Sequence, residues 1–164
     1  MLIRWLFILL AGALSLNAAA FEVGEFRNGL TRGQVKEMLT SWRFDRVQDS
    51  AETLLAYDLP EKNSNRSFRF HFCNDRLVTL EQAMKASVRN FIVITNNYLG
   101  TYGQPMRVDA GINVISSGEK NGLTINWRKG NDIIGVRYQQ LPGGEALAVV
   151  YEVSNTCWQT PRPQ

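Results

Sequence analysis

The chain has very few of the residues on which metal-binding and nucleophilic chemistry depend. It contains one histidine, His71, and two cysteines, Cys73 and Cys157. A structural zinc site usually takes four ligands, so the sequence predicts no metal site. A catalytic triad would depend on the single histidine, which stands between Phe70 and Phe72 in an alternating segment and is expected on a sheet surface. We therefore expect no metal and no cofactor.

The sequence also lacks the common motifs of hydrolases and nucleotide-binding proteins. Residues 115–118 do not match Gly-x-Ser-x-Gly, and Gly143-Gly144 is not followed by the Lys-Ser of a phosphate-binding loop. A hydrolase with two carboxylates across a cleft is the remaining enzymatic alternative. Its candidate residues stand in or beside polar turns, where solvated acids are ordinary, so we expect no enzyme. They are Asp45, Asp49, Glu52 and Asp58.

No strong excess of charge and no second long apolar run are present. The formal net charge is +3, which is too mild to predict binding to nucleic acid or to a polybasic membrane site. The apolar run at 5–14 follows Arg4 and precedes Ala18-Ala19-Ala20, as in a secretory signal peptide cleaved before Phe21. An uncleaved anchor is the alternative, although the run is short for a span. We expect a signal peptide at 1–20 and a periplasmic or secreted mature protein that is not membrane-embedded.

Export would place the two cysteines in an oxidising compartment. A Cys73–Cys157 disulfide is then expected, with two separately buried thiols as the alternative. In the chain-entropy model, closing so long a loop stabilises the fold by roughly 4 kcal/mol. No cysteine directly follows the apolar run, so the chain has no lipoprotein-type acylation site.

Residues 81–105 have the spacing of a long helix. Their apolar residues recur at steps of three and four, and Gly100, Gly103 and Pro105 end the pattern. A shorter helix is expected at 32–40 after the N-cap Thr31. The predicted helical stripe consists of Met84, Val88, Phe91, Ile92, Thr95, Tyr98, Leu99 and Tyr102.

Most other segments alternate with the period of two that indicates strands. In the first half these are 42–47, 53–59, 67–72 and 77–80, and in the second half 107–115, 123–127, 133–139 and 146–153. We therefore predict an α+β fold with helices packed on one face of a mostly antiparallel sheet. The order of one helix and about four strands occurs in 21–80 and again in 81–164, which indicates a possible tandem repeat, although chance similarity is the alternative.

A family resemblance accompanies this pattern. The segment GLTRGQVKEMLTSW at 29–42, a tyrosine strand and FRFHFCNDRL at 68–77 resemble the helix-plus-hairpin pattern of the small BamE-like envelope domains. The doubled form resembles the tandem-repeat beta-lactamase inhibitor proteins. The resemblance implies a helical layer on one side of an antiparallel sheet, and binding to other proteins rather than catalysis. BamE-type proteins are lipoproteins, and this chain departs from them in having no acylated cysteine.

Strand alternation also predicts where a partner would bind. If Phe68, Phe70 and Phe72 pack inward together with Leu123, Ile125 and Trp127, the residues between them point outward as a polar, mildly basic surface. We expect this surface to bind an acidic patch of an envelope protein, as an inhibitor or assembly factor. A plain solvated sheet face and a carrier of small apolar ligands are the alternatives. The predicted partner-binding residues are Arg69, His71, Asn126, Arg128 and Arg137, with Thr124 and Gln139 beside them.

Overall fold

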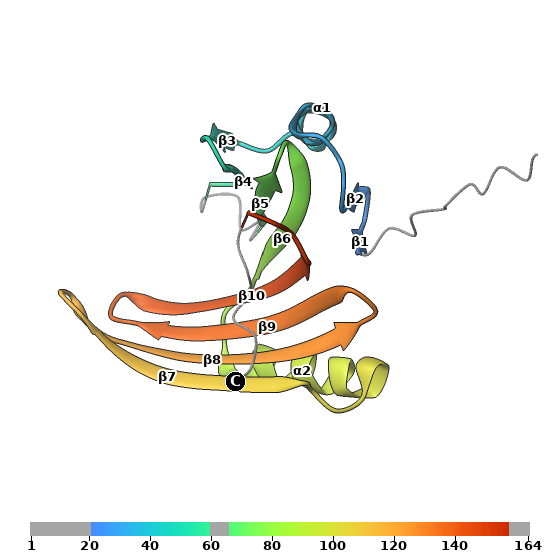
Figure 1. The fold of residues 1–164 in the computed structure, drawn as a ribbon. Coiled ribbons are helices and arrows are strands. Elements are labelled where there is room, and N and C mark those ends of the chain that lie inside the picture. The colour runs from blue at the N-terminus through green and yellow to red at the C-terminus, as the bar shows by residue number, and fades with distance from the viewer. Residues whose placement is uncertain (1–20, 60–65, 158–164) are drawn as a thin grey trace, which may run out of the picture.

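The computed structural model describes residues 21–59 and 66–157, so the predicted signal peptide at 1–20 lies outside it. Two helices and ten strands occur in the described ranges (Figure 1). In chain order they are β1 (Glu22–Val23), β2 (Phe26–Arg27), α1 (Arg32–Trp42), β3 (Arg46–Asp49), β4 (Thr53–Tyr57), β5 (Ser67–Cys73), β6 (Arg76–Met84), α2 (Val88–Tyr102), β7 (Arg107–Ile115), β8 (Gly118–Lys129), β9 (Asp132–Leu141) and β10 (Gly144–Val153).

One antiparallel sheet dominates the molecule. Its eight strands follow the order β3-β4-β5-β6-β10-β9-β8-β7, and β1 and β2 form a separate two-stranded ribbon. Each of the sequences β3–β6 and β7–β10 is a meander, and the pairing of β10 with β6 joins the two meanders. The predicted boundary between residues 80 and 81 falls inside β6.

The predicted α+β fold is wrong, because the described chain is mostly antiparallel β structure. The helices α1 and α2 have 11 and 15 residues, and each packs on its own half of a sheet whose longest strand, β8, has 12 residues. A helix rises only about 1.5 Å per residue against about 3.3 Å in a strand. Two such short helices cannot form a layer over eight strands.

Helix α1 begins and ends where local chemistry dictates. Thr31 and Gln34 form a reciprocal capping box at its start, and Arg43 closes it in the left-handed conformation with φ 53°. Val35 and Leu39 are buried against the aromatic side chains of β5. Because the helix continues to Trp42, the strand predicted at 42–47 begins only at Arg46.

Helix α2 is shorter than predicted. It starts at Val88 behind the cap of Ser87, while residues 81–84 belong to β6 and pair with 147–150 of β10. The predicted stripe is also partly wrong, because Val88 and Ile92 are exposed and Ile94 packs inward beside Phe91. Gly103, with φ 75°, ends the helix, and its carbonyl oxygen accepts a 3.0 Å hydrogen bond from Trp127 Nε1.

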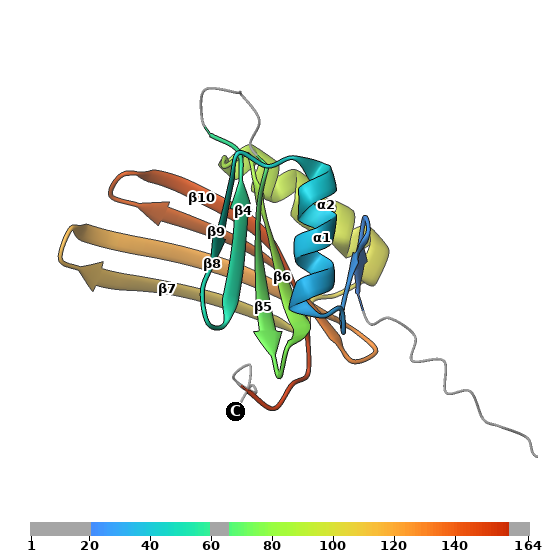
Figure 2. The same ribbon diagram turned by 90° about the horizontal axis from the view of Figure 1, so that it is seen from above.

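The apolar core has two parts, one in each half of the sheet. Phe68 and Phe70 pack with Phe26 and the apolar residues of α1, which lies along β5 and β6 (Figure 2). Trp127 and Phe91 belong to the second cluster, between α2 and β8–β10. Both clusters lie on the same face of the sheet, as the strand register requires.

The predicted disulfide is confirmed. Cys73 and Cys157 are joined, with their Cα atoms 5.6 Å apart across a sequence separation of 84 residues. The bond attaches the chain that follows β10 to the β5–β6 hairpin, so it closes a loop that contains most of the sheet.

Candidate protein-binding face

The sheet face opposite the two helices holds all five predicted partner-binding residues, and we call it the polar face. Phe68 and Phe70 are buried on the helix side of β5, so Arg69 and His71 point to the other side. Trp127 is likewise buried on the helix side of β8. The same alternation places Asn126 and Arg128 of β8 and Arg137 of β9 on the polar face.

These residues share a face without forming one cluster. Arg69 of β5 pairs with Glu81 of β6. The row continues through Val150 of β10 and Gly135 of β9 and ends at Asn126 of β8. That row crosses four strand spacings of about 4.8 Å, or roughly 19 Å in all. The predicted site is therefore a broad surface with two ends.

Small residues form the centre of the polar face. Arg137 reaches Glu81 at 3.6 Å between Nη2 and Oε2, across the intervening strand β10. The β10 residue paired with Arg137 is Ala148, whose short side chain leaves room for that contact. Sequence reasoning missed Glu81 because it assigned residues 81–84 to the helix.

A polar network occupies the β7–β8 end of the face. Asn126 Nδ2 donates to Asp109 Oδ2 at 3.3 Å, and Arg107 Nε donates to Asp109 Oδ1 at 2.5 Å. A Cβ atom on Gly135 would lie 2.9 Å from Asn126 Oδ1, so glycine is what leaves space for the Asn126 carboxamide. These side chains hold Asn126 in one position beside the exposed Arg128.

At the other end, Arg69 and His71 border a polar hollow of 520 Å³ next to the sheet edge. Burial lowers the pKa of His71, and the positive charges of Arg69 and Arg137 act in the same direction. Glu81 and Glu52 oppose that shift. The imidazole is therefore neutral near pH 7 and can both donate and accept a hydrogen bond. The hollow is lined by Gln48, Asp49, Ser50, Thr53, Leu55, Arg69 and His71.

The polar face has an excess of positive charge. By strand register, six basic side chains stand on it against three acidic ones. Two of the acidic groups, Glu81 and Asp109, contact arginines of the same face. A net positive surface suits an acidic partner. The basic residues are Arg46, Arg69, Arg107, Lys120, Arg128 and Arg137, and the acidic ones are Glu81, Asp109 and Glu152.

Three of the four candidate catalytic carboxylates have structural partners. Asp49 binds Arg32 and Lys36 of α1, and these contacts hold its pKa below the usual range despite an opposing effect of burial. Asp58 pairs with Arg66 at 2.6 Å. Asp45 accepts a 3.0 Å hydrogen bond from a backbone amide. These three carboxylates thus hold turns and strand ends in place.

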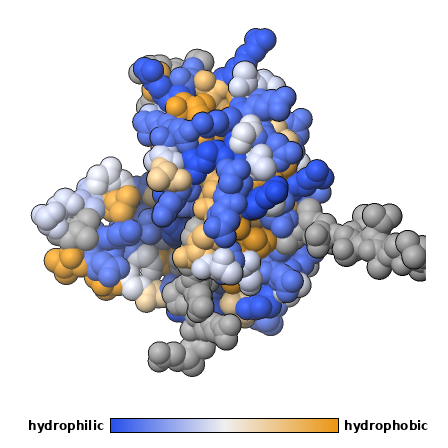
Figure 3. Space-filling model, turned by 45° about the horizontal axis from the view of Figure 1, so that its top comes forward, coloured by the Kyte–Doolittle hydropathy of each residue, from blue (hydrophilic) through white to orange (hydrophobic). Residues whose placement is uncertain are grey.

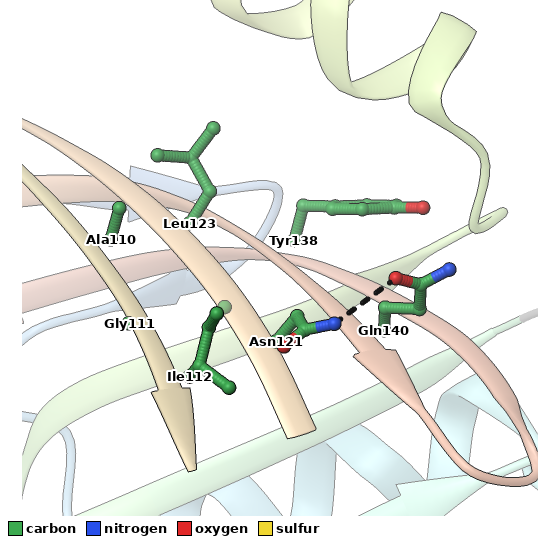
Figure 4. Close-up of a pocket in the computed structure, with 8 residues that line it drawn as sticks. Ala110, Gly111, Ile112, Asn121, Leu123, Tyr138 and Gln140 are labelled. Carbon is green, nitrogen blue, oxygen red and sulfur yellow. Dashed lines mark hydrogen bonds between the residues drawn. The ribbon is translucent and has the colours of Figure 1, made fainter. Parts of the chain in front are cut away.

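A second hollow, of 740 Å³, lies on the helix side of β7–β9 (Figure 4). Leu123, Ile112 and Tyr138 supply much of its apolar surface, and no α2 residue lines it. Asn121 Nδ2 donates to Gln140 Oε1 at 3.4 Å, while the buried Oδ1 of Asn121 has no hydrogen-bond partner. The hollow lies over strands alone, because its lining residues come from β7, β8 and β9.

Within residues 21–59 and 66–157, no three metal-ligating side chains come together. In the same ranges neither helix has the length and hydrophobicity of a membrane span. Comparisons with protein-family models, curated proteins and solved structures found no match. The resemblance to BamE-like domains and to the inhibitor proteins therefore stays a prediction.

Proposed function

We propose that this protein is a non-catalytic binding protein that recognises an acidic surface of another protein through its polar face. The main support is the excess of basic side chains on the sheet face opposite the helices. The disulfide fits an oxidising compartment such as the periplasm or the cell exterior. In that setting the partner is an envelope or secreted protein, and binding would serve inhibition or assembly.

The proposal is tested by capture of a partner from envelope extract on the immobilised protein, followed by mass spectrometry. The wild type should retain a protein with an acidic surface, and Arg69→Glu with Arg128→Glu should lose it. The matched control is Lys85→Glu with Arg89→Glu, which changes the net charge equally at exposed positions just before and within α2. Equal capture by both double variants would show that the polar face is not the site.

A carrier of small apolar ligands is the second candidate, and the hollow bordered by Leu123 and Ile112 favours it. A carrier should retain lipid-like material through purification, which mass spectrometry of an organic extract would detect. A protein-binding module should contain no such material after purification.

A further inference from the structure

The two edges of the sheet differ in how they are protected against further pairing. The edge strand β3 has only four residues, and two of them, Arg46 and Asp49, are charged. Asp49 also binds Arg32 and Lys36 of α1, so the helix holds this edge strand in place. Short length and charge are the usual protections of a sheet edge.

The opposite edge strand, β7, is much longer, and its two charged residues, Arg107 and Asp109, stand near its start. It has nine residues, contains no proline, and pairs with β8 without a register shift. From residue 110 to residue 115 it has no charged side chain. Val108, Ile112 and Val114 are 57%, 71% and 82% exposed. Figure 3 shows hydrophobic residues at the projecting end of the molecule where the β7–β8 hairpin lies in Figure 1. A long, regular, apolar edge of this kind is a template for another strand.

We propose that β7 pairs antiparallel with β7 of a second copy of this chain, so that two sheets become one. A two-fold axis at Gly111 would place Val108 opposite Val114 of the other copy, and Ala110 opposite Ile112. Apolar side chains of the two copies then meet on the helix side of the joined sheet. Each copy contributes its own hollow lined by Ile112 and Leu123 beside this seam. The exposed aliphatic side chains and the unpaired edge of the backbone are both covered by this arrangement.

Charge favours an identical copy as the occupant. The ionisable groups of β7 are Arg107 and Asp109, and they pair with each other at 2.5 Å. In the register centred on Gly111, Asp109 faces Asn113 of the second copy, so no like charges meet. The edge is therefore neutral in a chain whose formal net charge is +3, and two copies can approach here without local repulsion. Pairing would also double the area of the polar face, but it does not depend on the proposed function.

The test is the oligomeric state of the protein expressed from its full-length sequence and purified. Sedimentation equilibrium of the wild type should show a monomer–dimer equilibrium. Ile112→Lys with Val114→Lys should weaken dimerisation by at least about tenfold, because it places charges at the seam. The control, Val47→Lys, places a single lysine on the other edge strand, β3, at a residue that is 47% exposed, and should leave the equilibrium unchanged.

Hydrogen exchange at high and low protein concentration locates the interface. Amides of β7 should exchange more slowly at high concentration, and those of β3 should exchange at the same rate in both samples. The proposal would be overturned if the wild type is monomeric at every concentration. This holds whether the monomer is empty or is bound to an apolar ligand or to a strand of another protein. Equal dimerisation of the β7 and β3 variants would also overturn it. Arg69→Glu with Arg128→Glu should still dimerise, which separates this proposal from that of the partner-binding face.

Discussion

His71 links the charge of the polar face to the stability of the fold. Burial and two nearby arginines lower its pKa from the ordinary value of 6.5. Between its folded pKa and about 6.5, the unfolded chain binds more protons than the folded chain, so stability is lost as the pH falls through that interval. Well above 6.5 the histidine is neutral in both states and contributes no pH dependence.

We therefore predict that lowering the pH from about 7.5 to about 5.5 destabilises the wild type more than His71→Gln. Urea unfolding at the two pH values measures both losses of free energy. Comparing the variant with the wild type cancels the contributions of the carboxylates, including Asp132, whose pKa is raised by burial. Equal losses would contradict the assigned environment of His71.

Gly135 is the second informative residue, because its missing side chain leaves space for Asn126. Gly135→Ala should displace the Asn126 carboxamide, break its hydrogen bond to Asp109 and cost about 1 kcal/mol. In an Asn126→Ala background, the same substitution should be neutral or slightly stabilising, since alanine restricts the unfolded chain. A double-mutant cycle measures the coupling, and additive effects would show that the two residues do not interact.

At the scale of elements, α2 depends on Phe91 for its attachment to the sheet. Phe91 is 8% exposed and packs against Tyr138, with ring centroids 5.7 Å apart. Phe91→Ala should cost roughly 3–5 kcal/mol, as large core truncations do. Asn97→Ala, at an exposed position of the same helix, should stay within about 0.5 kcal/mol of the wild type. Chemical denaturation of both variants tests this, and similar midpoints would mean that the helix is packed differently.

The same elements show what the sequence could and could not predict. Alternation of Phe68 and Phe70 with Arg69 is a local signal, and it assigned side chains to the correct faces of β5. Residues 81–84 have a helical spacing but pair with β10, more than sixty residues away, and no local pattern contains that information. For the same reason the contact of Glu81 with Arg137 could not be predicted. The predicted α+β class is wrong because it treated two short helices as a layer that covers one face of the sheet.

At the scale of the whole molecule, the disulfide closes a loop around most of the sheet. Replacing Cys73 and Cys157 together by serine should lower the free energy of unfolding by up to about 4 kcal/mol, because the unfolded chain regains the entropy of the open loop. Urea unfolding of the variant and of the wild type with and without reductant measures this. The reduced wild type should match the variant, and an unchanged midpoint would contradict a structural role for the bond.

The central claim is that the polar face binds an acidic partner without any change in the core. Arg69 and Arg128 stand on strands whose buried residues point the other way, so their charges can be reversed with little effect on packing. The most direct measurement is titration calorimetry of the captured partner against Arg69→Glu with Arg128→Glu, alongside thermal unfolding of the same variant. We predict affinity reduced by at least about a hundredfold with a nearly unchanged melting temperature. Wild-type affinity in a folded variant would contradict the claim.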